Sequence, residues 1–327
     1  MLNTRTLMIA LAIAALAVAP AFIYPMLIVK LLCFAIFASA FNLMLGYTGL
    51  LSFGHAMFFG SAGYALGVTM KHLGWPPELG ILAGVAVAAL IGFLAGSVAI
   101  RRQGIYFAMI TLAISQLIYF VAMQMEWTGR DDGFHGIPRG TLFGIIDLQD
   151  DMALYGLVAA CFLLALFAVH RIVTSPFGQV LTAIRENEPR AISLGYDVDR
   201  YKVLAFTLSG ALSGLAGALK ALALSYESLN DLHWALSGEV VMMCILGGLG
   251  TLGGPVAGAF FVILLQNFLA DKVGEWLSVI IGVVFLTCIL AFRKGFVGEI
   301  GAWIEKMRAR KGSAAEAGTE TRQEGNR

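Results

Sequence analysis

Charged residues are scarce in this sequence of 327 residues, since Asp, Glu, Lys and Arg make up 13% of the chain, against about 25% in an ordinary soluble domain. Hydrophobic residues make up 59%, and apolar runs recur from end to end. A lipid core of about 30 Å needs about 20 helical residues, so these runs predict transmembrane helices. Strands that alternate polar and apolar residues are absent, which excludes a lipid-facing β-barrel.

Cysteine is also rare: the four residues lie far apart inside apolar runs and are expected to be buried hydrophobes rather than a disulfide or metal site. The phosphate-binding pattern G-x-x-x-x-G-K-[ST] is missing, so any ATP must be hydrolysed by a partner. The pattern G-x-G-x-x-G does occur over residues 248–253, but the residues after it are almost wholly apolar and fit bundle packing instead of a nucleotide fold. The five histidines have no ligand spacing, which argues against a membrane enzyme.

The apolar runs predict an all-α fold, a polytopic bundle of about ten membrane segments with some of them short or interrupted. The predicted segments are residues 6–24, 26–46, 48–70, 79–100, 104–124, 152–170, 203–224, 238–250, 255–271 and 275–292. Arginine and lysine gather in the loops on one side of this count, and the positive-inside rule assigns that side to the cytoplasm. Both termini of this predicted inner-membrane protein are then expected in the cytoplasm, and the net charge of +1 gives no indication of nucleic-acid binding.

By this count residues 1–295 form one transmembrane domain, and each end of the chain has a feature of its own. Arg5, a short apolar run and the small residues 17–19 imitate a cleavable signal peptide. An uncleaved first span is favoured because further apolar spans follow at once. Residues 296–311 predict an amphipathic helix on the cytoplasmic membrane face, and residues 312–327 are predicted to be disordered.

Two stretches of small and polar residues interrupt apolar runs, at residues 46–55 and 247–255. Interrupted spans often mark the substrate path of a transporter; for the second stretch a plain tight turn is an equal alternative. The polar residues nominated for a path are Asn42, Ser52, His55, Ser115 and Gln116. For His55 a hydrogen-bonded packing role is favoured over substrate contact, and for Ser115 and Gln116 hydrogen bonding between helices is favoured.

The most informative stretch is a charged island over residues 175–202, within a loop over residues 171–202. Its charges are too costly for lipid, yet it holds apolar residues that a solvated linker would not need. Their spacing predicts a helix over 180–188 whose apolar face packs into a cleft of a soluble partner, with Pro189 ending or kinking it and Gly195 stopping a second short helix. The residues assigned to this contact are Val180, Leu181, Ile184, Arg185, Glu186, Glu188 and Gly195.

Four stretches together resemble one known family. They are NLMLGYTGLLSFGHAMFFGSAGYALG (42–67), DDGFHGIP (131–138), SPFGQVLTAIRENEPRAISLGYDVDRYKVLAFTLSGALSGLAGAL (175–219) and GGLGTLGGPVAGA (247–259). On these stretches the chain closely resembles the LivM-type permease subunits of branched-chain amino acid ABC importers, from about residue 25 to residue 295. The island resembles the EAA coupling loop of other importers only loosely, because Pro189 and Arg190 replace the first two residues of that motif.

The resemblance implies a permease domain that works with other subunits. It implies a second permease, homologous or identical, two ATP-binding subunits that contact the island, a periplasmic binding protein, and surrounding membrane lipid. It implies no cofactor, no metal and no enzymatic activity. The charge-rich loop over residues 126–151 is then the expected docking site for the binding protein, with Asp131, Asp132 and Arg139 on its surface; a merely solvated loop is the alternative.

The expected substrates are branched-chain or related amino acids, and importers of urea, short amides or aromatic acids in the same family are the alternative. A secondary transporter is the alternative from a different class. Such a transporter usually carries a charged residue in the middle of the membrane. Glu78, Lys220 and Glu239 all fall near the ends of predicted spans, which disfavours this alternative.

Overall fold

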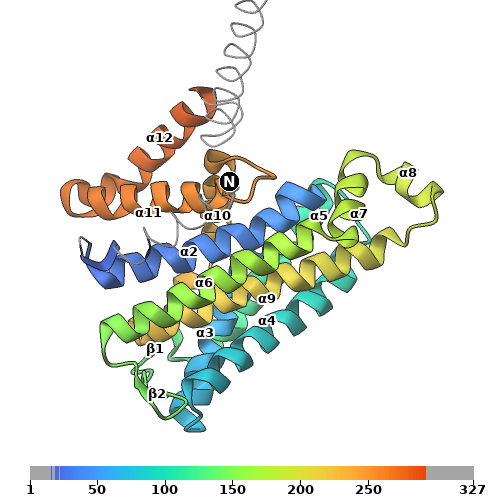
Figure 1. Ribbon diagram of the computed structural model, residues 1–327. Helices are drawn as coiled ribbons and strands as arrows, with labels where there is room; N and C mark the ends of the chain where they lie inside the picture. Colours follow the sequence, from blue (N-terminus) through green and yellow to red (C-terminus); the bar gives the residue numbers. More distant parts are fainter. Residues whose placement is uncertain (1–15, 17–18, 22, 292–327) are drawn as a thin grey trace, which may run out of the picture.

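The computed structural model describes residue 16, residues 19–21 and residues 23–291, and within them helices dominate (Figure 1). The expected helical class is confirmed for this part of the chain, which holds only four strands of two residues each. The predicted first span over residues 6–24 lies mostly outside the described residues. The predicted amphipathic helix and tail, residues 296–311 and 312–327, lie outside them entirely.

Five helices in the described part are long and apolar enough to cross a membrane. They are α2 (Pro25–Asn42) with its continuation η2 (Leu43–Thr48), α4 (Pro77–Ala99), α5 (Ile105–Gln124), α6 (Asp151–Thr174) and α9 (Val198–Leu224). Four further predicted segments coincide with α3 (His55–His72), α10 (Trp234–Gly247), α11 (Gly254–Val273) and α12 (Leu277–Ala291). α10 has 14 residues and rises only about 21 Å, too little to cross a lipid core of about 30 Å. The chain is thus a multi-pass membrane protein, and ten membrane segments remain a prediction.

α9 lies at the centre of the bundle, where it packs against α2, α3 and α4. Two small residues let its neighbours approach closely. A Cβ atom at Gly217 would overlap the backbone of Phe59 in α3, and one at Gly214 would overlap the Cβ of Ala88 in α4. Because α9 is held on several sides over 27 residues, it forms a continuous column through the molecule.

The two ends of the bundle are built differently and lie far apart in Figure 1. One end, called the α7–α8 end, holds the island as α7 (Pro176–Glu186) and α8 (Glu188–Ser193). The other, called the strand end, holds two antiparallel pairs: β1 (Phe134–His135) with β4 (Tyr226–Glu227), and β2 (Thr141–Leu142) with β3 (Ile146–Asp147). Short 3-10 turns are η1 (Ala19–Ala21), η3 (Glu126–Thr128), η4 (Arg130–Asp132), η5 (Leu229–Asp231) and η6 (Gly274–Trp276). The island and the loop over residues 126–151 therefore lie at opposite ends of the bundle, as the charge count requires.

The island folds as two helices whose boundary differs from the predicted one. The sequence predicts a helix over 180–188, but α7 begins four residues earlier and ends two residues earlier. Asn187 is extended (φ −158°, ψ 92°), and its side chain accepts a hydrogen bond from the N–H of Arg190 at 3.1 Å, which makes it the N-cap of α8. Pro189 then lies in the first turn of α8, where its missing N–H costs no helical bond. Gly195 is left-handed (φ 88°) just after α8, as the helix-stop prediction requires.

Candidate functional site

The two interrupted stretches meet at the α7–α8 end, where one buried side chain joins them. Asn42 ends α2, and its Nδ2 donates a hydrogen bond to the carbonyl oxygen of Thr251 at 2.9 Å. Its Oδ1 accepts a hydrogen bond from the N–H of Gly250 at 3.0 Å. Asn42 thus satisfies two backbone groups of the connection between α10 and α11. Asn42, which the sequence nominates for the translocation path, therefore holds the end of α2 to the second interrupted stretch.

The break after α2 is an ordered π-helical turn, η2, a form that is rare and frequent at functional sites. It is followed by Gly49, whose backbone is left-handed (φ 76°). A Cβ atom at Gly49 would lie 2.9 Å from Cγ of Arg185. Both the conformation of this turn and the close approach of α7 therefore require glycine.

Arg185 attaches the island to this break. Its Nη1 donates a hydrogen bond to the carbonyl oxygen of Gly46, inside η2. Gly46 in turn faces the second break, since a Cβ atom there would overlap the side chain of Asn42 and approach the backbone nitrogen of Gly250. We call Asn42, Gly46, Arg185, Gly250 and Thr251 the junction. It links α7 with both interrupted membrane stretches through two sets of hydrogen bonds that meet where Gly46 packs against Asn42 and Gly250.

The apolar face predicted for the island is present, but it packs inside this chain. Leu181 belongs to the main hydrophobic core, and Ile184 packs against Ala191 of α8 and Val198 of α9. Val180 is only partly buried beside them. The sequence predicts that this face enters a cleft of a partner, and the structure differs because α8 and α9 already cover it.

The apolar surface that the island does expose belongs to α8 and the residues after it. Ile192, Leu194 and Tyr196 are 57%, 69% and 40% exposed. None of these three residues is among those that the sequence assigns to the partner contact. In the structure Ala191 is buried, so Ile192, the next residue of this short helix, faces outward. The sequence alone does not show which of the two is buried.

Two acids assigned to the partner contact have different surroundings. Glu186 is exposed at the end of α7. Glu188 instead accepts a hydrogen bond from Lys202 Nζ at 2.6 Å, and that lysine is 1% exposed. Glu188 therefore ties α8 to the first turns of α9.

His55 is enclosed by aromatic rings, which supports the packing role favoured for it. Its ring lies edge-on to those of Phe41, Phe58 and Phe206, with centroid distances of 4.7, 5.3 and 5.6 Å. Ser209 Oγ donates to the carbonyl oxygen of Ala40 at 2.6 Å, so His55 Nε2 donates to Ser209 Oγ at 2.9 Å. The imidazole is thereby held between α2, α3 and α9.

The other path candidates differ in how far their polar atoms are satisfied. Ser52 is buried, and its Oγ accepts a hydrogen bond from the N–H of Gly54 at 3.2 Å within the first break. Ser115 Oγ and Gln116 Nε2 on α5 are buried, and neither has a hydrogen-bond partner within the described residues. The helix-to-helix hydrogen bonds expected for Ser115 and Gln116 remain predictions. His55 Nδ1 is likewise buried without a partner within the described residues, so Ser115, Gln116 and His55 are the path candidates left with unused polar atoms.

At the strand end, the three residues nominated for docking are placed differently. Asp131 and Asp132 lie in η4, and Asp132 is exposed. Arg139 is largely buried: its Nη1 lies 2.9 Å from Asp151 Oδ1, and its Nη2 donates to the carbonyl oxygen of Ala223 at 2.8 Å. Arg139 therefore braces the loop against α6 and α9 and does not lie on the docking surface as predicted.

A buried cluster of charges, which the sequence reasoning missed, also lies at the strand end. Lys220 is near the end of α9, as expected, but only 6% exposed, and its Nζ donates to Asp231 Oδ2. The same nitrogen lies 3.7 Å from Glu227 Oε2. Burial raises the pKa of Glu227 well above its ordinary value, although Lys220 opposes this shift. The signal in the sequence is the two acids that follow the lysine after α9 ends.

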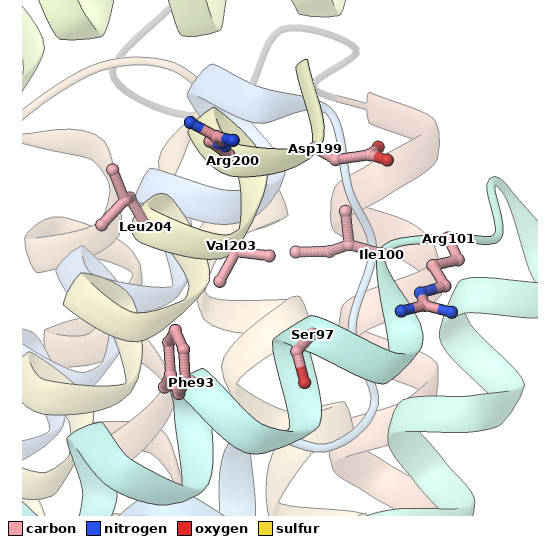
Figure 2. Close-up of a pocket in the computed structure, with 8 residues that line it drawn as sticks. All are labelled: Phe93, Ser97, Ile100, Arg101, Asp199, Arg200, Val203 and Leu204. Atoms are coloured by element: carbon pink, nitrogen blue, oxygen red, sulfur yellow. The ribbon is translucent and has the colours of Figure 1, made fainter. Parts of the chain in front are cut away.

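An open groove of about 440 Å³ lies between α4 and α9 near the α7–α8 end (Figure 2). Its lining residues are Phe93, Ser97, Ile100, Arg101, Asp199, Arg200, Val203 and Leu204. Apolar and charged side chains meet here, as is typical of a membrane–water boundary. The groove shares no residue with the junction, so it is separate from the interrupted stretches.

Comparison with known proteins identifies the family. A family model described as branched-chain amino acid transport system / permease component matches residues 23–289. The chain belongs to this family. Members of this permease family are transporters and not enzymes, and the apolar helices of this chain agree with that class. The resemblance inferred from the four sequence stretches is confirmed.

Curated relatives of this permease are found in several organisms. The high-affinity branched-chain amino acid permease LivM of Escherichia coli K12 is 29% identical over 258 residues, and that of Salmonella typhimurium LT2 is 30% identical; each match covers 70% of this chain and 60% of the relative. The autoinducer 2 import system permease LsrC of Enterobacter sp. 638 is 27% identical over 218 residues, with 64% and 61% covered. The chain thus spans about 60% of the length of these relatives. No solved structure matches the chain.

Proposed function

We propose that this chain is a permease subunit of an ABC importer and forms part of the translocation path for branched-chain or related amino acids. The junction carries the proposal, because it attaches a charged island outside the membrane to both interrupted membrane stretches. The substrate class is supported by the LivM relatives, which match with higher identity and over more of the chain than LsrC of Enterobacter does.

The two ends of the bundle suit different partners. Two ATP-binding subunits contact the α7–α8 end, where Ile192, Leu194 and Tyr196 form an exposed apolar surface. The arginines near this end support a cytoplasmic location for it. A periplasmic binding protein docks at the strand end, close to Asp131 and Asp132. A second permease, homologous or identical, completes the path within the inner membrane.

Transport then follows from movement of the junction. When ATP closes the ATP-binding subunits, α8 moves, and α7 moves with it because Ile184 packs against Ala191. Arg185 carries this movement to the carbonyl of Gly46, and Asn42 carries it to the connection between α10 and α11. Both breaks shift together, so the path closes on one side as it opens on the other. The loaded binding protein must bind one of the two states more tightly, since equal affinity for both would shift nothing.

This function is tested by measuring uptake by the complete importer in proteoliposomes, with its cognate binding protein outside the vesicles and ATP inside them. Leucine, isoleucine and valine should enter only when ATP is present. Uptake without ATP that follows a proton or sodium gradient would indicate a secondary transporter instead. ATP-driven uptake of urea, short amides or aromatic acids, without uptake of amino acids, would keep the importer class and change the substrate.

The junction is tested in the same assay by removing its arginine. Arg185→Gln should lower uptake about tenfold or more, within the range of typical coupling energies, while the complex still assembles. Arg171→Gln is the matched control, because it removes the same charge at the exposed end of α6 without touching the junction. Full uptake by Arg185→Gln would show that the junction does not couple the subunits.

A further inference from the structure

α9 carries a buried lysine near each of its ends, and each lysine is paired with an acid from outside the helix. Lys202, 1% exposed, bonds to Glu188 of α8 at 2.6 Å. Lys220, 6% exposed, bonds to Asp231 of η5 and lies 3.7 Å from Glu227. The two lysines are 18 residues apart in the sequence, which corresponds to about 27 Å along a helix.

The ion pair at the strand end connects α9 to the loop over residues 126–151. Glu227 belongs to β4, and the register of the β1–β4 pair places it opposite Phe134, a residue of that loop. The Glu227 carboxylate fits against α3 only because position 63 is glycine, since a Cβ atom there would overlap it. A displacement of β1 therefore acts on the segment that holds Lys220.

The pair at the other end connects α9 to the surface that the island exposes. Glu188 is the first residue of α8, and Ala191 of the same helix packs against Val198 of α9. Ile192 and Leu194 lie just beyond on the exposed side. Both a charge pair and an apolar contact thus make α8 follow α9.

Between the two pairs α9 has no interruption. It runs as one α-helix of 27 residues, and α2, α3 and α4 pack along it. Breaking one partner from a buried ion pair leaves an uncompensated charge, which strongly favours keeping the pair closed. One end of α9 is therefore attached to α8 and the other to η5. Because α9 is a continuous helix, a shift at one end can be transmitted to the other.

We propose that α9 and its two buried lysines form the link by which docking of a loaded binding protein at the strand end stimulates the ATP-binding subunits at the α7–α8 end. This inference rests on the proposed function and adds its long-range route. Lys202 and Lys220 act as positioning residues, since they touch neither substrate nor nucleotide. In this proposal the junction transmits movement to the translocation path, whereas α9 transmits the effect of binding-protein docking to the ATP-binding subunits.

The test compares basal ATP hydrolysis with hydrolysis stimulated by loaded binding protein, in the complete importer. Asp231→Asn and Glu188→Gln should each lower the stimulation about tenfold, within the range of typical coupling energies, and Asp231→Asn should keep basal hydrolysis within about twofold. A double variant should lose no more than the worse single variant, because the two pairs serve one route. Independent contributions would multiply instead.

An exchange of charges separates this link from simple loss of structure. Lys202→Glu together with Glu188→Lys restores the pair with its signs reversed and should recover most of the stimulation that Glu188→Gln loses. If Glu188→Gln fails to assemble, the variant with exchanged charges still tests the link. ATP hydrolysis stimulated nearly as much as in the wild type supports the link, and an assembled complex with basal hydrolysis alone overturns it. Assembled single variants with full stimulation would also overturn it. A wild-type importer without any stimulation would defeat the proposed function itself.

Discussion

The side chain of Asn42 holds the backbone of Thr251, which lies 209 residues further along the chain, through a hydrogen bond of 2.9 Å from Nδ2 to the carbonyl oxygen. The neighbouring N–H of Gly250 bonds to the other end of the same amide. One buried side chain thus keeps two breaks in the membrane helices in register. A mechanism that moves either break must move both, or break these bonds.

Asn42→Leu should destabilise the protein and abolish uptake together. It leaves two backbone groups without their partner, and each unsatisfied buried group costs about 1–3 kcal/mol. The midpoint temperature of unfolding in detergent and uptake in proteoliposomes measure the two effects. Ser39→Ala, one turn earlier on α2, removes only a local bond to the carbonyl of Ala35 and should lower stability by about 1 kcal/mol or less. Equal effects of the two substitutions would contradict a special role for Asn42.

His55→Phe should keep the affinity for substrate, because the imidazole is enclosed by three aromatic rings and bonded to Ser209. A phenyl ring keeps the aromatic packing although it is somewhat larger than the imidazole, and loss of one hydrogen bond costs about 1 kcal/mol of stability. Uptake measured over a range of substrate concentrations should show an unchanged KM. A KM raised about tenfold or more would correspond to lost binding energy of about 1.4 kcal/mol or more and would place His55 in contact with the substrate.

Two isoleucines of the island should respond in opposite ways to the same change. Ile184→Asp places a carboxylate among Ala191 and Val198 inside this chain and should destabilise the isolated permease by on the order of 3 kcal/mol. Ile192→Asp changes an exposed residue and should leave stability within about 0.5 kcal/mol, while weakening co-purification of the ATP-binding subunits. Thermal unfolding of the permease alone and the subunit ratio of the purified complex separate the two. If the Ile184→Asp permease is stable but loses the ATP-binding subunits, α7 and not α8 forms the contact with them.

Glu227→Gln should be tolerated better than Asp231→Asn. Burial raises the pKa of Glu227, so its neutral form is favoured, and glutamine resembles that form. Asp231→Asn removes the acid that bonds directly to Lys220. Because a raised pKa stabilises a protein at low pH and this contribution is lost as pH rises through the folded value, Glu227→Gln should gain stability relative to the wild type at alkaline pH. Thermal unfolding over a pH series measures this, and a relative loss at high pH would contradict it.

Reversing the charges of Asp131 and Asp132 should slow docking of the binding protein, chiefly at low salt, because charges at the rim of an interface act mainly on association rate. Association kinetics at two salt concentrations provide the measurement. Arg139→Ala should lower thermal stability instead, since this side chain braces the loop through Asp151 and Ala223. Unchanged docking by the double aspartate variant at low salt would show that the loop is merely solvated.

The sequence alone determined where the membrane helices are and which ends of them carry charge. The segment predicted over residues 79–100 is α4, at 77–99, and the one predicted over 203–224 lies within α9. Lipid forces such apolar runs into helices, because backbone groups find no other hydrogen-bond partners there. Local stereochemistry also sufficed for Gly195, whose left-handed backbone follows a short helix.

Only the tertiary structure decided which polar groups meet and which faces are free. The pairing of Asn42 with Thr251 and of Lys220 with Asp231 joins separate elements, and the burial of Ile184 depends on where α8 and α9 lie. Helical periodicity shows that a face is apolar, but the same pattern fits a contact inside the chain or with a partner. That choice depends on how the helices pack, and packing is a property of the whole fold rather than of any one segment.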